Sequence, residues 1–226
     1  MNNLRKTDIL GTVAWVATAP FVQERFCYSL AEMVSYNTTH LETENKKIYY
    51  DHQQMSWLPR GRNDIVKSMR GDWVFMLDAD MEFEPDCLSE MLKIMNKYNA
   101  PVVTGLYVHK KKPYFPVLYS HNTKRKVYEI IAKWDGNPDI FQVDASGAGC
   151  LLIKKFVFNL IWNKLNEDPF DVIAKLGEDF SFFDRLSRVG VGVYCAPKIK
   201  FTHLGIQGYN YNPDYNKRIL TKGYIR

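Results

Sequence analysis

Residues 71–84 read GDWVFMLDADMEFE, and this stretch decides how the rest of the chain is interpreted. A Gly-Asp turn signal is followed by the apolar run WVFML, whose composition favours a buried strand. Asp78 and Asp80 then follow directly, on either side of Ala79. Two carboxylates at the end of a buried strand are costly unless something neutralises them. Because open α/β sheets bind ligands at the carboxyl ends of their strands, we expect a ligand site here.

The two aspartates favour a particular kind of ligand. Hard divalent cations such as Mn²⁺ and Mg²⁺ prefer carboxylate oxygen, and a diphosphate can complete their coordination. We therefore interpret Asp78 and Asp80 as a metal-diphosphate site. The alternative is a loop in which Asp78 caps the helix that begins near Pro85 and Asp80 is solvated. That alternative accounts more readily for one aspartate than for two.

Size and composition indicate one globular α/β domain. The chain has 226 residues, of which 46% are hydrophobic and 24% charged. Its net charge of +5 suits an anionic ligand, and admits nucleic acid without implying it. Four cysteines occur without a CxxC pair, which favours a reducing compartment and a cytoplasmic location. No apolar stretch approaches the roughly 20 residues that span a bilayer.

The spacing of apolar residues predicts strands that alternate with helices, which is typical of a mainly parallel sheet. The first apolar run could also be the core of a signal peptide, because Arg5 and Lys6 precede it and it ends in Ala-Thr-Ala. An α/β domain needs a first strand, so we favour that interpretation. We expect strands at residues 9–17, 48–54, 73–77, 100–108 and 191–201, and helices at 21–36, around 65–69, at 85–99, 156–165 and 180–189.

Several segments leave two interpretations open. Arg62 and Asn63 belong either to a solvated helix turn or to a nucleotide site, and the lysines at 110–112 form either a solvated loop or an acceptor contact. Residues 113–140 contain several helix and strand breakers, so short strands or a mobile loop both fit. Residues 146–149, SGAG, indicate backbone that runs close to another backbone or a ligand, without the spacing of a P-loop or a dinucleotide fingerprint.

Together these motifs resemble the GT-A class of nucleotide-sugar-dependent glycosyltransferases, in particular the family 2-like group. The resemblance implies an α/β fold: a single GT-A (Rossmann-like) domain over residues 1–226, with a mixed, mainly parallel sheet flanked by helices. Residues 1–108 would form the nucleotide-sugar half, 109–205 the acceptor half, and 206–226 a lid or tail. The matching features are the strand ending at 17–20, Arg62-Asn63, the DxD motif Asp78-Ala79-Asp80, the segment 146–149 before LLIKK, Glu178-Asp179 at a helix start, and His203 after a strand.

The same resemblance implies roles for individual residues. Asp179 would be the base that takes the proton of the acceptor hydroxyl, with Glu178 in support. Mn²⁺ or Mg²⁺ would be held by Asp80, Asp78 and His203, whereas His40, His52, His109 and His121 receive no role. Donor contacts would come from Ala17, Thr18, Pro20, Arg62, Asn63, Asp78, Ala79 and Asp80, and acceptor contacts from Gly147, Ala148 and Gly149.

The implied activity is that of a metal-dependent hexosyl- or pentosyltransferase. It would move a sugar from a nucleoside-diphosphate sugar to an acceptor hydroxyl, with inversion if Asp179 is the base; retaining GT-A enzymes share similar motifs. One alternative is a sugar nucleotidyltransferase, which would need a Gly-rich basic loop after the first strand, where this chain has TAPF. Another is a non-catalytic nucleotide- or sugar-binding protein. The acceptor stays open among glycan, lipid, protein, small molecule and modified DNA, as does the oligomeric state.

Overall fold

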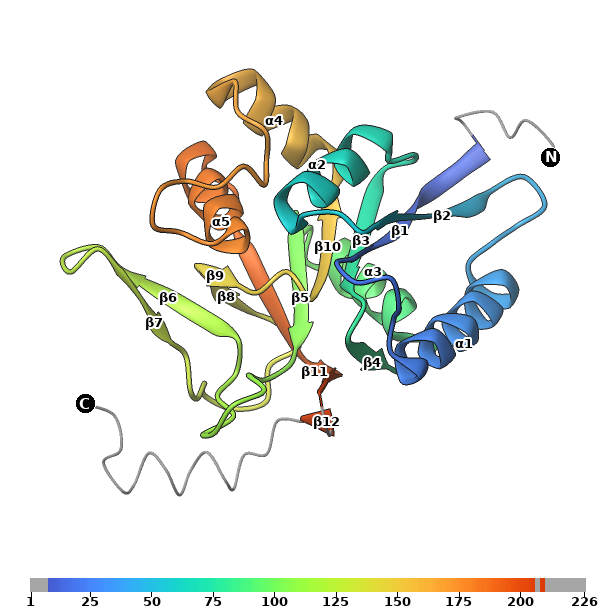
Figure 1. Cartoon of the computed structure of the whole chain (residues 1–226), viewed down its shortest axis with the longest axis horizontal. Coiled ribbons are helices and arrows are strands. Elements are labelled where there is room, and N and C mark those ends of the chain that lie inside the picture. Colours follow the sequence, from blue (N-terminus) through green and yellow to red (C-terminus); the bar gives the residue numbers. More distant parts are fainter. Residues whose placement is uncertain (1–7, 206–207, 210–226) are drawn as a thin grey trace.

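The computed structural model describes residues 8–205 and 208–209 (Figure 1). Five helices are present in this part of the chain: α1 Glu24–His40, α2 Leu58–Ser68, α3 Cys87–Lys97, α4 Lys155–Leu165 and α5 Glu178–Val189. The strands are β1 Ile9–Ala17, β2 Lys47–Gln54, β3 Trp73–Asp78, β4 Met81–Phe83, β5 Val102–Leu106, β6 Leu118–Asn122, β7 Val127–Ile130, β8 Phe141–Val143, β9 Ala145–Ser146, β10 Cys150–Lys154, β11 Val193–Leu204 and β12 Gly208–Tyr209.

The central sheet has the strand order β12-β11-β5-β10-β3-β1-β2. Strand β1 is parallel to both of its neighbours, β2 and β3, and β5 is parallel to β11. Strand β10 is antiparallel to β3 and β5 and lies between them. Strands β4 and β8 also pair with β11, and β7-β6-β9 form a smaller sheet. The sheet is therefore mixed and mainly parallel, as the sequence predicted.

Helices cover both faces of the central sheet. Helices α1 and α3 pack on one face, where α3 contacts β5 and β11. Helices α2, α4 and α5 lie on the other, where α2 contacts β1 and β2 and α4 contacts β10 (Figure 1). This three-layer arrangement leaves the edge at the carboxyl ends of the parallel strands free of covering helices, and the loops there can build a site.

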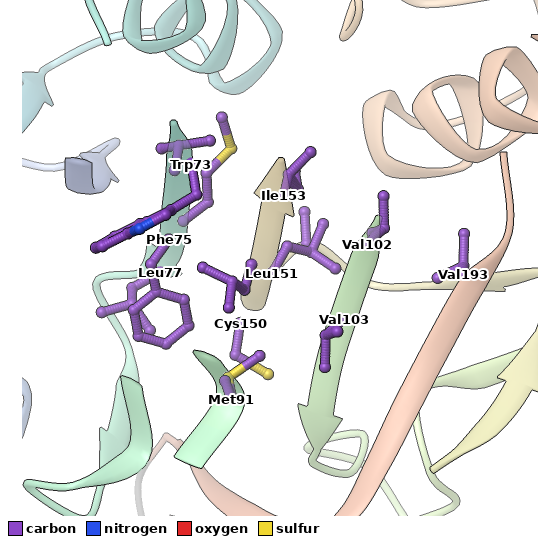
Figure 2. Close-up of a cluster of buried hydrophobic side chains, with 14 of the residues drawn as sticks. Trp73, Phe75, Leu77, Met91, Val102, Val103, Cys150, Leu151, Ile153 and Val193 are labelled. Atoms are coloured by element: carbon purple, nitrogen blue, oxygen red, sulfur yellow. The ribbon is translucent and has the colours of Figure 1, made fainter. Parts of the chain in front are cut away.

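The core explains why the central strands are apolar without alternation. Phe75 of β3, Leu151 of β10 and Val103 of β5 are all fully buried. Figure 2 shows these three strands side by side, with apolar side chains between the sheet and its helices. A strand covered on both faces needs apolar residues at every position, which is why WVFML and CLLI are continuous runs.

Helix boundaries differ most from the predictions at the end of α1 and at the start of α2. Helix α1 extends to His40 rather than ending near Asn37, because the Thr38 and Thr39 hydroxyls hydrogen-bond the Val34 and Ser35 carbonyls within the last turn. Helix α2 begins at Leu58, which places Arg62 and Asn63 inside the helix rather than in a leading turn.

Other predictions are confirmed. The hairpin β6–β7 gives residues 113–140 short strands. Helix α5 ends at Gly190, whose φ of 77° is the left-handed conformation that favours glycine. Residues 9–17 are a strand paired on both sides, so the strand interpretation of the first apolar run is confirmed.

The four cysteines carry free thiols, and all but Cys27 are buried. Among the helices of the described residues, none has the length and apolarity needed to cross a membrane. The predicted lid or tail at residues 206–226 lies almost entirely outside the described residues.

Candidate active site

A cavity of about 240 Å³ lies where the predicted donor motifs meet. Pairing of β1 with β3 sets Val16 opposite Asp78, so the loop after β1 lies beside the DxD motif. Five of the predicted donor residues line this cavity, whereas Pro20, Arg62 and Asn63 do not. Its lining comprises Val16, Ala17, Thr18, Ala19, Phe21, Val22, Gln23, Leu58, Asp78, Ala79 and Asp80.

Arg62 joins the end of β3 to the start of α5. Its side chain is only 4% exposed, and its Nη2 and Nη1 atoms donate to Asp78 Oδ1 and Glu178 Oε1, each at 2.7 Å. Burial alone would lower the pKa of the guanidinium, but the charges of these two carboxylates outweigh that effect and raise the pKa. The interpretation of Arg62 as part of a solvated turn is therefore wrong. Its contacts hold Asp78 and Glu178 in position, and direct contact with a nucleotide stays a prediction.

Asn63 is also committed to protein contacts. Its Nδ2 donates to Asp171 Oδ1 at 2.8 Å, and its Oδ1 accepts from the Phe170 backbone N–H at 2.9 Å. These bonds fix the segment that leads into α5. Its predicted nucleotide contact is not tested by this geometry.

Strand β11 brings His203 to Asp80. It pairs antiparallel with β4, which sets His203 opposite Met81, and the Leu204 backbone N–H donates to the Asp80 carbonyl at 2.7 Å. His203 Nε2 consequently lies 3.7 Å from Asp80 Oδ1. Because the Val108 carbonyl 3.0 Å from Nδ1 can only accept, we assign the ring hydrogen to Nδ1, which leaves a lone pair on Nε2. Burial lowers the pKa of His203 and favours this neutral form.

This pair has the chemistry of a partial cation site. Asp80 Oδ1 is buried and has no hydrogen-bond partner, and it faces the Nε2 lone pair of His203. A ligating histidine typically donates its other ring N–H to a carbonyl, as His203 does to Val108. Asp78 instead binds Arg62. Across the described residues, no group of three or more His, Cys, Asp or Glu side chains is arranged to hold a metal ion, so the fit rests on Asp80 and His203.

Asp179 lies in the first turn of α5, next to Glu178. Its Oδ1 accepts the Phe180 backbone N–H at 2.8 Å. Burial raises the pKa of Asp179, as does the charge of Glu178, although the Phe180 N–H and Arg62 oppose these effects. A carboxylate with a raised pKa is a stronger proton acceptor than an ordinary one, as a general base must be.

The small residues at 147–149 are buried next to the end of β3. A Cβ on Gly147 would lie 2.1 Å from Tyr107 Oη, and the Gly149 backbone N–H donates to that same oxygen at 3.2 Å. The Gly149 carbonyl accepts from the Asp78 backbone N–H at 3.0 Å. The glycines therefore allow Tyr107 and the end of β3 to approach closely. Acceptor contact by residues 147–149 stays a prediction.

Comparison with protein families agrees with this geometry. The model of glycosyl transferase family 2 matches residues 31–151, which is more than half of the chain and includes the DxD motif. The chain belongs to glycosyltransferase family 2. Membership implies a nucleotide-sugar donor. Glu178, Asp179 and His203 lie beyond the matched residues.

The fold of this glycosyltransferase is shared with a solved structure. A197 from STIV superposes with a TM-score of 0.58 and 20% sequence identity, over 90% of this chain and 91% of that one. At this identity the likeness supports the GT-A fold alone. No curated protein matches the chain.

The glycosyltransferase has a second cavity, of about 410 Å³, that the sequence did not reveal. His109 was given no role, yet it lines this cavity together with His203. The Nε2 atom of His109 hydrogen-bonds the Tyr119 hydroxyl at 2.9 Å. Burial lowers the pKa of His109 most, and the nearby His203 lowers it further. The only sign of this cavity in the sequence was the run of lysines at 110–112, which we interpreted as a solvated loop or an acceptor contact. The cavity is lined by His109, Lys110, Lys111, Lys112, Pro113, Phe115, Ile130 and His203.

Proposed function

We propose that this family 2 protein is a metal-dependent hexosyl- or pentosyltransferase. It transfers a sugar from a nucleoside-diphosphate sugar to an acceptor hydroxyl, with inversion at the anomeric carbon. The observation that carries the proposal is the unpartnered, buried Asp80 Oδ1 facing His203 Nε2 at 3.7 Å.

Asp80 and His203 would hold Mn²⁺ or Mg²⁺, with diphosphate oxygens completing the coordination. When bound, the cation supplies Lewis-acid stabilisation of the charge on the departing nucleoside diphosphate. Asp78, fixed by Arg62, would contact the donor ribose or the cation. Asp80 lies in the turn between β3 and β4 and His203 lies in β11, so their approach depends on the pairing of β4 with β11.

The first cavity would hold the nucleoside. It runs from the loop after β1 to the DxD motif, so a nucleoside bound there directs its diphosphate toward Asp80. Phe21 lines the cavity while 77% exposed, and its ring offers a stacking surface for the base.

Asp179 would accept the proton of the acceptor hydroxyl as its oxygen attacks the anomeric carbon. The new glycosidic bond forms as the bond to the nucleoside diphosphate breaks, and the proton ends on the Asp179 carboxylate. Glu178 is already bound by Arg62, whereas Asp179 has only the Phe180 N–H among the hydrogen-bond donors of the described residues. That difference supports Asp179 as the base.

The test is a thermal-shift panel of nucleoside diphosphates and nucleotide sugars, each with and without Mn²⁺. A ligand that binds only the folded state raises the midpoint. We expect a shift that needs both metal and nucleoside diphosphate, and its loss in Asp80→Asn but not in the matched exposed variant Asp135→Asn. No shift with any member of the panel would contradict the proposal.

A turnover assay separates the alternatives. Metal-dependent release of nucleoside diphosphate from a nucleotide sugar is expected of a glycosyltransferase. Release of pyrophosphate from a nucleoside triphosphate and a sugar 1-phosphate would instead identify a nucleotidyltransferase, and binding without either reaction would identify a binding protein.

A further inference from the structure

Of the residues that line the second cavity, only His203 takes part in the donor chemistry proposed above. We propose that it is the acceptor site, and that it takes an acceptor carrying a phosphate monoester next to an apolar group. This inference rests on the proposed glycosyl transfer, since it assigns the acceptor of that reaction.

The charge of the cavity favours an anion. Lys110 is paired with Asp80, but the side-chain ammonium groups of the exposed Lys111 and Lys112 make no hydrogen bond or ion pair with any other described residue. Within the described part of the chain, no aspartate or glutamate lines the cavity. Two uncompensated ammonium groups in one cavity match the two negative charges of a phosphate monoester.

Part of the wall of the cavity is apolar. Pro113, Phe115 and Ile130 form it, and Ile130 is 43% exposed although it is a large aliphatic residue. Inorganic phosphate or a small polar phosphate would leave this wall in water. A phosphate joined to an aryl or prenyl group would cover it and gain the free energy of apolar burial.

The position of the cavity favours the acceptor over the donor. The two cavities share no lining residue, and Asp80 lines only the first. Two residues that line the second cavity, Lys110 and His203, contact Asp80. A third, His109, bonds Tyr119, whose ring packs edge-on against Phe180 at 4.9 Å between centroids. A ligand in the second cavity would thus contact residues that reach Asp80 of the cation site and, through His109 and Tyr119, Phe180, which directly follows Asp179.

The inference is tested by titration calorimetry of the whole protein without metal, using four probes. Phenyl phosphate and geranyl phosphate carry both features, glycerol 3-phosphate lacks the apolar group, and benzyl alcohol lacks the phosphate. We expect the first two to bind more tightly than the last two, and the preference between them indicates an aryl or a lipid source. Equal binding of glycerol 3-phosphate would overturn the apolar part of the inference.

Variants then assign the binding to the cavity. We expect Lys111→Gln/Lys112→Gln to weaken phenyl phosphate binding by roughly tenfold or more, the equivalent of about 1.4 kcal/mol. The matched control is Lys124→Gln/Lys126→Gln, which removes two exposed lysines from the turn between β6 and β7. An equal effect of both double variants, or no effect of either, would overturn the site.

Mn²⁺-dependent binding of nucleoside diphosphate, measured on the same proteins, separates this inference from the proposed function. If it weakens in Lys111→Gln/Lys112→Gln as much as phenyl phosphate binding does, the lysines serve the donor and the inference is overturned. If the wild type binds phenyl phosphate through these lysines but no nucleoside diphosphate, the proposed function fails and the acceptor assignment falls with it.

Discussion

Lys110 Nζ lies 2.5 Å from Asp80 Oδ2, on the carboxylate whose other oxygen faces His203. The ammonium group therefore neutralises the charge that a divalent cation would neutralise. Because the cation must compete with this pair, we expect Lys110→Gln to lower the Mn²⁺ concentration needed for nucleoside diphosphate binding. The change should be up to about fivefold, since a pair this exposed is worth roughly 1 kcal/mol at most. A Mn²⁺ titration followed by thermal shift measures it; a raised requirement would make Lys110 a diphosphate ligand instead.

Asp179→Asn should separate chemistry from binding. The amide keeps an oxygen to accept the Phe180 N–H but cannot take a proton, so donor binding should persist while kcat falls by about 10²–10⁴-fold. Asp184→Asn, on the same helix, is the matched control and should keep near-normal turnover. Steady-state release of nucleoside diphosphate measures both variants. Near-normal turnover of Asp179→Asn would remove Asp179 from the base role.

The raised pKa of Asp179 also predicts a pH dependence of stability. The folded protein holds the proton more tightly than the unfolded chain, so ionisation of this group costs stability as pH rises through the folded-state pKa. We expect Asp179→Asn to have the higher Tm at pH 7, with the difference vanishing below pH 3.8, the ordinary value for this carboxyl. Thermal unfolding across pH measures this, and a Tm difference independent of pH would contradict it.

The pH dependence of turnover should also report the ionisation of Asp179. The base works only when ionised, so kcat should fall with decreasing pH through a pKa above that of an ordinary aspartate. If kcat instead fell with the pKa of an ordinary aspartate, the raised pKa that we expect from the burial of Asp179 would be contradicted.

Arg62→Met should destabilise the protein far more than a surface arginine change. It leaves Asp78 and Glu178 without their shared cation, at a cost of about 3 kcal/mol or more. The control Arg25→Met breaks an exposed pair with Glu82 and should cost about 1 kcal/mol or less. Urea unfolding gives both values. Similar midpoints for the two variants would show that the Arg62 contacts add nothing to stability.

Gly147→Ala should be rescued in part by Tyr107→Phe. The new Cβ would meet the Tyr107 hydroxyl oxygen at 2.1 Å, and such overpacking costs roughly 1–3 kcal/mol. Removing the hydroxyl relieves the clash but loses the bond from the Gly149 N–H, worth about 1 kcal/mol. The double variant should therefore lose less stability than the sum of the single ones. Simple additivity in urea unfolding would contradict this packing.

The local spacing of apolar residues and glycines was sufficient to predict some features of the structure and insufficient to predict others. The strand before Asp78 and the helix after Glu178 follow from apolar spacing and from Gly190, and both are confirmed. The buried state of Arg62 was not predictable, because a polar residue in a helix is ordinarily solvated and its two partners lie 16 and 116 residues away in sequence. The position of His109 in a cavity was missed for the same reason, since Ile130 and His203, which also line that cavity, lie far from it in sequence.

By itself, the sequence determined the five helices, the parallel strands of the central sheet, the family resemblance and the acidic end of β3, because these depend on residues close together in the chain. Strand β10, which lies between β3 and β5, was not among the predicted strands. Only the tertiary structure decided which side chains meet. The pairing of β4 with β11 brings His203 to Asp80, α2 inserts Arg62 between Asp78 and Glu178, and the loop after β5 forms the lysine-lined cavity. The physical reason is that long-range strand pairing and helix packing set these distances, and local sequence does not encode them.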